Sequence, residues 1–181
     1  MVFFKNGDPA YITKRFDVQE DGIKLAMEDF ASLGGRGTDF KYTGNYLALF
    51  KLLKTYVPAN PIEAIKLFKV LLFNYLISNG DAHYKNFSLT ETSLGDFKLS
   101  PAYDLLNSKI HIEDRDFALE NGLLPLNESK SKVTEQFFKL AELAGISKKQ
   151  YEKTFKNITS NTVSTEPLLC MGSKGQGVKK V

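Results

Sequence analysis

The sequence has little of what a covalently or metal-stabilised protein needs. Its 181 residues include no tryptophan, only two histidines, and a single cysteine, Cys170. One cysteine excludes an internal disulfide and metal sites built from several cysteines, and no His/Cys/Glu cluster supports zinc. With 43% apolar and 25% charged residues, the composition is that of a folded protein of one domain or one large lobe.

The sequence also lacks the patterns of membrane, secreted and nucleic-acid-binding proteins. No charged-then-apolar leader opens the chain, and the net charge of +3 comes without a block dense in lysine or arginine. The most apolar stretch, residues 62–77, contains Glu63, Lys66 and Lys69 and is too short to span a bilayer comfortably. We therefore expect a cytoplasmic protein that contacts neither a membrane nor nucleic acid directly.

Three polar residues have the order and spacing of a phosphoryl-transfer site. Asp81 and Asn86 are separated by five positions, and Asp104 follows after a short strand–turn–strand pattern. In such enzymes one carboxylate takes the proton of the acceptor, while an amide and a second carboxylate hold Mg²⁺ against the phosphates of ATP. Each residue alone is explained by a turn or a cap. The coincidence of all three favours the site.

His83 and Lys85, which lie between Asp81 and Asn86, each allow two interpretations. His83, two positions after the expected base, either contacts nucleotide phosphates or is a hydrogen-bonded structural residue. Lys85 is either a local phosphate or carboxylate partner, or a solvated surface lysine.

Apolar periodicity predicts a mostly helical chain with short strands. The helix over 60–78 is apolar on nearly every side, so we expect it to be buried and to deliver Asp81 at its end. Thr43 is the expected N-cap of the helix before it, and Ser147 with Gln150 forms a capping box. Residues 108–128 are predicted as loop and 172–181 as a disordered tail. The predicted helices are 20–33, 43–56, 60–78, 133–144 and 147–158, and the predicted strands are 2–4, 11–16, 87–90 and 97–99.

Three segments carry a family resemblance over about residues 11–145. They are Tyr-Ile-Thr-Lys-Arg-Phe-Asp at 11–17, Ser-Asn-Gly-Asp-Ala-His-Tyr-Lys-Asn-Phe-Ser at 78–88, and Leu-Ser-Pro-Ala-Tyr-Asp at 99–104. Together they resemble the HipA-like serine/threonine kinases, the toxin components of bacterial toxin–antitoxin pairs. The resemblance implies that Asp81 is the catalytic base and that Asn86 and Asp104 bind magnesium. It also implies that residues 83–86 line the ATP phosphates. In the family, the backbone of a hinge strand contacts adenine, and the resemblance implies that this strand is formed here by Lys14, Arg15 and Phe16.

The resemblance also sets an expected organisation. The family's phosphate-gripping loop and ATP-binding lysine lie in an N-terminal lobe before the hinge strand, whereas only about ten residues precede that strand here. We expect an α+β, mostly helical fold, a kinase-like C-terminal lobe with a small inserted β-hairpin and without the N-terminal ATP-gripping lobe. Its parts would be a hinge segment (1–18), the lobe (19–160) and a flexible tail (161–181).

The expected function is Mg²⁺-dependent transfer of the ATP γ-phosphate to a serine or threonine of a protein. The family acts on protein hydroxyls, in some members on an aminoacyl-tRNA synthetase, and often pairs with a DNA-binding antitoxin. A separate N-lobe subunit is a further expected partner. Two alternatives remain: an inactive or truncated lobe that serves as a binding module, and a small-molecule kinase of the aminoglycoside or choline type. The latter usually carry His-Gly-Asp, where this chain has Asn79 before Gly80.

Overall fold

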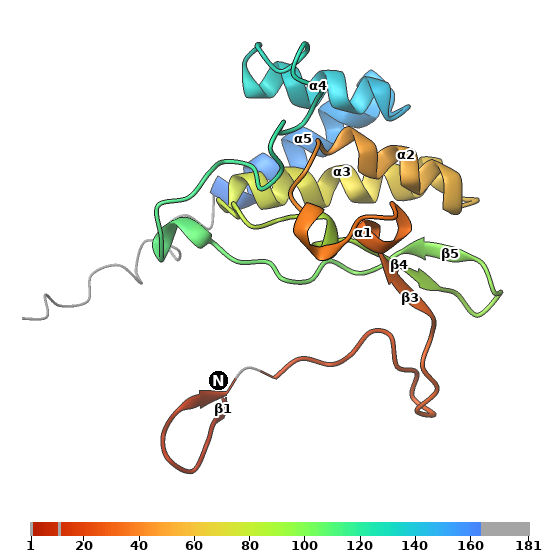
Figure 1. Ribbon diagram of the computed structural model, residues 1–181, viewed down its shortest axis with the longest axis vertical. Helices are drawn as coiled ribbons and strands as arrows, with labels where there is room; N and C mark the ends of the chain where they lie inside the picture. Colours follow the sequence, from red (N-terminus) through yellow and green to blue (C-terminus); the bar gives the residue numbers. More distant parts are fainter. Residues whose placement is uncertain (1, 11, 164–181) are drawn as a thin grey trace, which may run out of the picture.

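A layer of helices lies beside a small three-stranded sheet in this computed structural model, which describes residues 2–10 and 12–163 (Figure 1). Helix α3 (Asn60–Leu76) runs through the middle of the helical layer and packs against α2 (Leu47–Tyr56), α5 (Lys148–Val163) and strand β5 (Phe97–Leu99). Helix α4 (Val133–Leu143) packs on α5. This α+β, mostly helical architecture agrees with the fold predicted from the sequence.

The sequence of α3 explains its place in the core. Pro61 lies in the first turn, where a missing N–H costs nothing, and the buried side chains Leu67, Phe68 and Leu71 recur at helical spacing. The prediction of burial on nearly every side is wrong at Ile62 and Phe73, which are exposed. The neighbours of α3 cover only part of its surface.

The start of α2 also departs from the prediction. Thr43 is not its N-cap, because the helix begins at Leu47 and no side chain caps it. Instead, the backbone N–H groups of Tyr46 and Leu47 donate to the carbonyls of Gly122 and Leu123, at 3.0 and 3.2 Å. A tertiary contact thus satisfies the N–H groups that a cap would otherwise bind. By contrast, the predicted capping box before α5 is confirmed by bonds between Ser147 and Gln150.

The sheet has the antiparallel order β3–β4–β5, formed by Met27–Asp29, Ser88–Glu91 and Phe97–Leu99. The β4–β5 hairpin confirms the two strands predicted there. The helix predicted over 20–33 is wrong except for its last turn, α1 (Phe30–Leu33). Residues 27–29 pair with β4 instead, because a long-range strand partner outweighs a partial helical pattern.

The first residues form the predicted hairpin only in part. Strand β1 (Val2–Phe3) pairs antiparallel with β2 (Pro9–Ala10). The strand predicted over 11–16 is wrong: residues 12–16 are not a strand, and no strand pairs with them in the described ranges. Residue 11 and the predicted tail at 172–181 lie outside the described residues.

The long segment between β5 and α4 is mostly irregular, which agrees with the loop predicted over 108–128. Its regular part is a short 3₁₀ helix, η3 (Ser108–Ile110). Within the ranges that the structure describes, no helix is both long enough and apolar enough to cross a membrane.

Two side chains of equal size on α3, one buried and one exposed, give a matched test of the core. Leu67 is fully buried, whereas Ile62 on the same helix is 62% exposed. Leu67→Ala should lower the free energy of unfolding by about 2–5 kcal/mol, because it removes buried methyl groups and leaves a cavity. Ile62→Ala should change it by no more than about 0.5 kcal/mol. Urea denaturation followed by circular dichroism measures both, and equal losses would contradict the burial described here.

Candidate active site

The turn after α3 is held by one buried asparagine. Asn79 is 3% exposed, and its side-chain amide donates to Asn74 Oδ1 at 2.7 Å and to the carbonyl oxygen of Asp104 at 3.1 Å. Its Oδ1 accepts the backbone N–H of Asp81 at 3.2 Å. One side chain therefore ties the end of the helix, the turn and the segment carrying Asp104 to one another.

The segment after β5 also binds and packs against this turn, at Ser78 and Gly80. The Gly80 N–H donates to Ser108 Oγ at 2.9 Å, and that hydroxyl lies 3.1 Å from the Ser78 carbonyl oxygen, to which it donates. A Cβ on Gly80 would overlap the Asp114 carboxylate and lie 2.5 Å from the carbonyl oxygen of Arg115. The approach of these two backbones requires glycine at this position.

The structure brings Asn86 and Asp104 together. Asn86 ends the short 3₁₀ helix η2 (Tyr84–Asn86), and its amide Nδ2 donates to Asp104 Oδ2. The β4–β5 hairpin returns the chain between them, as the sequence predicted. Asp104 adopts a left-handed backbone conformation, with φ of 56°, which is uncommon for a residue other than glycine.

Asp81 is linked to this pair through the backbone of His83. The His83 N–H is shared between the carbonyl oxygen of Asp81, at 2.8 Å, and Asn86 Oδ1, at 2.9 Å. The three residues singled out in the sequence therefore belong to one hydrogen-bonded group.

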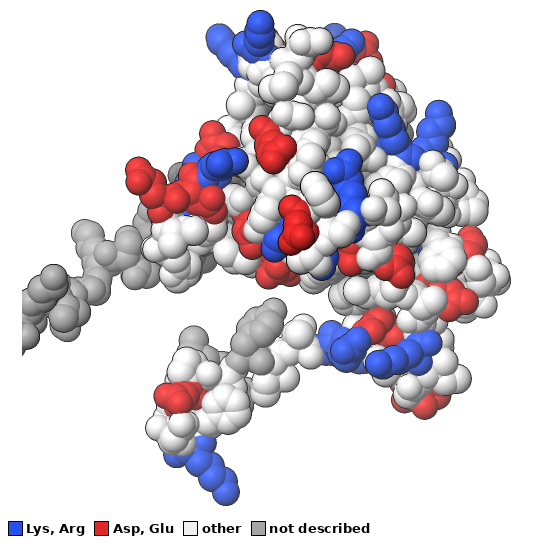
Figure 2. All heavy atoms as spheres, viewed as in Figure 1, with Lys and Arg blue, Asp and Glu red and all other residues white. Residues whose placement is uncertain are grey.

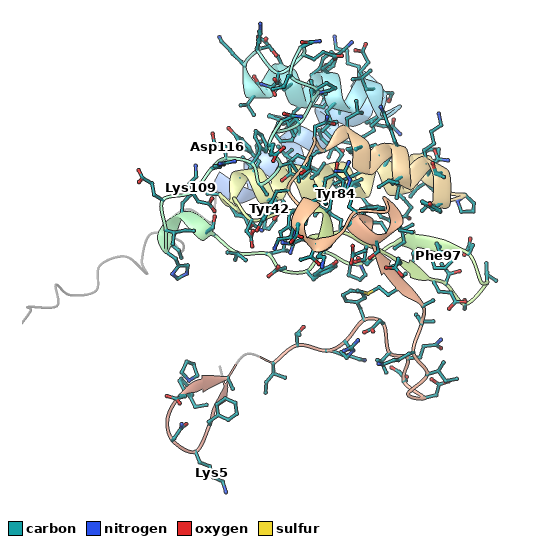
Figure 3. All side chains as sticks on the ribbon, viewed as in Figure 1. Lys5, Tyr42, Tyr84, Phe97, Lys109 and Asp116 are labelled. Atoms are coloured by element: carbon teal, nitrogen blue, oxygen red, sulfur yellow. The ribbon has the colours of Figure 1, made fainter. Side chains whose placement is uncertain are left out.

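Tyr42 belongs to the site and was missed by sequence reasoning. Its hydroxyl donates to Asp81 Oδ1 at 2.8 Å, and its ring meets that of His83 edge-on, with the centroids 5.0 Å apart. Figure 3 shows Tyr42 near the C-terminal end of α3. Tyr42 is 39 positions from Asp81 in the sequence. No local motif marks it, so only the fold could reveal the contact.

His83 lies in a buried position. It is 7% exposed, and burial, followed by the nearby charge of Lys41, lowers the pKa of its imidazole. A lowered pKa favours the neutral ring near neutral pH. Its Nδ1 has no hydrogen-bond partner among the described residues. The burial of His83 fits a structural role, whereas its unpaired Nδ1 does not, and a phosphate contact stays a prediction.

Lys85 is half-buried, and its ammonium donates to Thr38 Oγ1 at 3.1 Å. Its backbone carbonyl accepts the hydroxyl of Tyr103, the residue before Asp104, at 2.7 Å. This second bond ties η2 to the segment that carries the second carboxylate. The predicted phosphate contact of the Lys85 side chain stays a prediction.

The residues predicted to meet adenine lie on irregular backbone. Lys14 and Arg15 are exposed, and the guanidinium of Arg15 donates to Asp17, which lowers the pKa of that carboxyl. The ring of Phe16 lies 5.9 Å from that of Tyr103. Of the three, Phe16 therefore reaches the neighbourhood of the site, and their contact with adenine stays a prediction.

The Asn86–Asp104 pair suits a magnesium ion that keeps its other ligands outside the protein. Mg²⁺ takes oxygen ligands and is usually held by one or two carboxylates together with waters and substrate phosphates. Asn86 Oδ1 accepts one N–H and retains a second lone pair, and Asp104 is exposed. In the described part of the chain, no group of three or more His, Cys, Asp or Glu residues could form a protein-only metal site.

Comparison with known proteins identifies the family. The family model described as HipA-like C-terminal domain matches residues 1–165. The chain belongs to this family. Two curated relatives from Sinorhizobium fredii carry the names "Putative kinase Y4dM" and "Putative kinase Y4mE". The first is 38% identical, and the match covers 62% of this chain and 27% of the relative. The second is 32% identical, and the match covers 57% of this chain and 26% of the relative. The chain thus spans about a quarter of the curated relatives it matches.

A solved structure shares the fold of this HipA-like chain. It is described as the Shewanella oneidensis MR-1 toxin–antitoxin system HipA, HipB and its operator DNA complex. The match has a TM-score of 0.68 at 18% identity and covers 91% of this chain and 42% of that one. It confirms the predicted kinship in fold with HipA.

The surface charge of the HipA-like chain is mixed on the face drawn in Figure 2. Acidic and basic side chains are interspersed over it, and they do not separate into a basic and an acidic half. Because nucleic-acid interfaces gather their lysines and arginines on one surface, this face does not have the charge pattern of such an interface.

Alanine substitutions at Gly80 and Gly37 give a matched test of the close packing between the turn after α3 and the segment around Asp114. Gly80→Ala should lower the free energy of unfolding by about 1–3 kcal/mol, because the new methyl group overlaps Asp114 and the Arg115 backbone. Gly37 has no atom within 4 Å of an added Cβ and a φ of −65°. Gly37→Ala should therefore leave stability nearly unchanged in thermal unfolding. A tolerated Gly80→Ala would show that the segment around Asp114 does not pack on the turn.

Proposed function

We propose that this chain is the catalytic and metal-binding part of a HipA-like serine/threonine protein kinase, transferring the γ-phosphate of ATP to a protein hydroxyl in the cytoplasm. Family membership and the kinase names of its relatives indicate a kinase-related role. The observation that carries the finer proposal is the hydrogen-bonded group in which Asp81 and Asn86 share the N–H of His83 and Asn86 binds Asp104. It combines a carboxylate with an amide–carboxylate pair, which is the equipment of phosphoryl transfer.

Each residue has one task in this proposal. The acceptor oxygen forms a bond to the γ-phosphorus as the bond to the leaving oxygen of ADP breaks, and the acceptor's proton passes to Asp81. Asn86 and Asp104 hold Mg²⁺, which when bound offsets the negative charge of the phosphates. Asn79 keeps the base at a fixed position relative to Asp104, which supports the alignment that transfer needs.

The remaining nucleotide contacts belong to the same proposal. His83 and Lys85 line the ATP phosphates, and the segment of Lys14, Arg15 and Phe16 meets adenine. The relatives extend well beyond the matched quarter of their length. We propose that such a further part, in the same chain or as a separate subunit, completes the grip on ATP.

The partners follow from the family. The solved HipA structure includes HipB and operator DNA, which supports a DNA-binding antitoxin as a partner of this chain. The proposed substrate is a protein with an accessible serine or threonine, and an aminoacyl-tRNA synthetase is one candidate.

Removing the proposed base gives the sharpest test of transfer. Asp81→Asn keeps the size of the side chain but removes the group that takes the proton. It should lower the transfer of ³²P from labelled ATP to an arrayed Ser/Thr peptide library by about 10²–10⁴-fold. Asp96→Asn is the matched control, because Asp96 lies in the turn before β5 and an amide can still accept the Thr92 hydroxyl. Undiminished labelling by Asp81→Asn would refute the assignment. Labelling of aminoglycosides or choline in place of peptides would identify a small-molecule kinase.

The metal assignment predicts a separate effect at Asp104. Asp104→Asn removes a negative ligand but leaves Asp81 in place. Because even partners of metal ligands affect metal affinity by about 10–100-fold, this change should raise the Mg²⁺ concentration for half-maximal transfer at least tenfold. Titration with Mg²⁺ at fixed ATP measures it, again against Asp96→Asn. An unchanged Mg²⁺ requirement would exclude Asp104 as a ligand.

A further inference from the structure

We propose that Tyr42 is a positioning residue for the catalytic base: its hydroxyl holds one oxygen of the Asp81 carboxylate, so that the other oxygen receives the proton of the acceptor. The inference rests on the proposed kinase function. It concerns a residue outside the three segments that carry the family resemblance. It also assigns different tasks to the two oxygens of one carboxylate.

The hydrogen bond is the first support. The Tyr42 hydroxyl lies 2.8 Å from Asp81 Oδ1, a length at which an O–H donor bonds well to a carboxylate. Within the described part of the chain, no hydrogen bond is made to Oδ2. A carboxylate held at one oxygen loses rotational freedom, and the free oxygen keeps its lone pairs for a proton.

The backbone around Tyr42 is fixed by two other segments, one of which belongs to the site. Its carbonyl oxygen accepts the N–H of Glu120 at 3.0 Å, and the carbonyl oxygen of Lys41 accepts the N–H of Tyr84 at 3.3 Å. Tyr84 begins η2, the short helix that also carries Asn86. The donor to the base is thus tied to the element that carries the amide ligand.

The ring of Tyr42 is held on two sides. One contact is with the buried ring of His83, whose centroid lies 5.0 Å away at an interplanar angle of 70°. The other is with the Lys41 ammonium, 4.7 Å from the centroid of the Tyr42 ring. Packing of this kind restricts the side-chain rotamer, which a group that orients a catalytic residue requires.

The protonation state of Tyr42 agrees with this role. Partial burial of the Tyr42 side chain, which is 37% exposed, followed by the hydrogen bond to Asp81, raises the pKa of the Tyr42 hydroxyl above its ordinary value. The phenol therefore keeps its proton at neutral pH and acts as a donor to the carboxylate. An ionised phenolate at the same place would repel the base instead.

Tyr42→Phe separates the hydroxyl from the ring, because phenylalanine keeps both ring contacts and loses only the donor. It should lower kcat for the best peptide of the library by about tenfold to hundredfold, with KM for ATP and the melting temperature unchanged. Tyr56→Phe is the matched control: Tyr56 is exposed and donates to the carbonyl oxygen of Leu33 at 3.4 Å, far along α2 from the base. It should leave kcat unchanged.

A second measurement detects the contact without any turnover. In ¹³C-tyrosine-labelled protein, with the Tyr42 signal assigned from Tyr42→Phe, Asp81→Asn should lower the pKa of Tyr42. The reason is that the amide removes a negative charge that favours the protonated phenol. Asp96→Asn should leave the Tyr42 titration where it is.

The outcomes separate the inference from the proposed function. A kcat of Tyr42→Phe that is unchanged or raised would overturn the inference, and a raised value would mean that the hydroxyl blocks the base. An unshifted Tyr42 titration in an enzyme that Asp81→Asn inactivates would likewise overturn the inference alone. If the wild-type protein labels no peptide even in the presence of the further part that completes the grip on ATP, although the Tyr42 titration responds to Asp81→Asn, the kinase proposal is overturned and with it the catalytic role of Tyr42.

Discussion

The hydrogen bonds of buried Asn79 are the constraint on which the candidate site depends. The side chain joins the last turn of α3 through Asn74, the backbone of Asp81, and the carbonyl of Asp104. A buried amide left without these partners would cost about 1–3 kcal/mol, so the three segments are stabilised only in this arrangement. Because the bonds fix the positions of both acids, the same group that satisfies a buried side chain also sets the geometry of the site.

The helical core gives this arrangement a rigid base. The buried face of α3, with Leu67, Phe68 and Leu71, anchors the helix against its neighbours, and the turn projects directly from its end. The segment around Ser108 and Asp114 closes on the turn from the other side. A site supported by packing on one side and by hydrogen bonds on the other suits phosphoryl transfer, in which positioning and electrostatics supply most of the catalysis.

Membership of the HipA-like family and the geometry of the site support the same proposed chemistry from different observations. The family match covers residues 1–165, whereas the hydrogen-bonded group consists of the side chains of Asn86 and Asp104 and the backbone of Asp81 and His83. Tyr42 adds a feature that neither the motif nor the family resemblance contained. It links the loop before α2 to Asp81, and it extends the candidate site from one continuous stretch of sequence to two parts of the chain.

The sequence by itself determined the elements whose signals are local. The periodicity of α3, the capping box of Ser147 and Gln150, and the β4–β5 hairpin are all set by residues within a few positions of one another. The polar residues of the stretch from Asp81 to Asp104 could be singled out for the same reason.

Tertiary structure decided what local patterns could not. Residues 27–29 became a strand because β4 offered a partner, and α2 began at Leu47 because the backbone of Gly122 and Leu123 bound its first N–H groups. Tyr42 reached Asp81 through packing between segments 39 positions apart, and such an encounter leaves no pattern in the sequence.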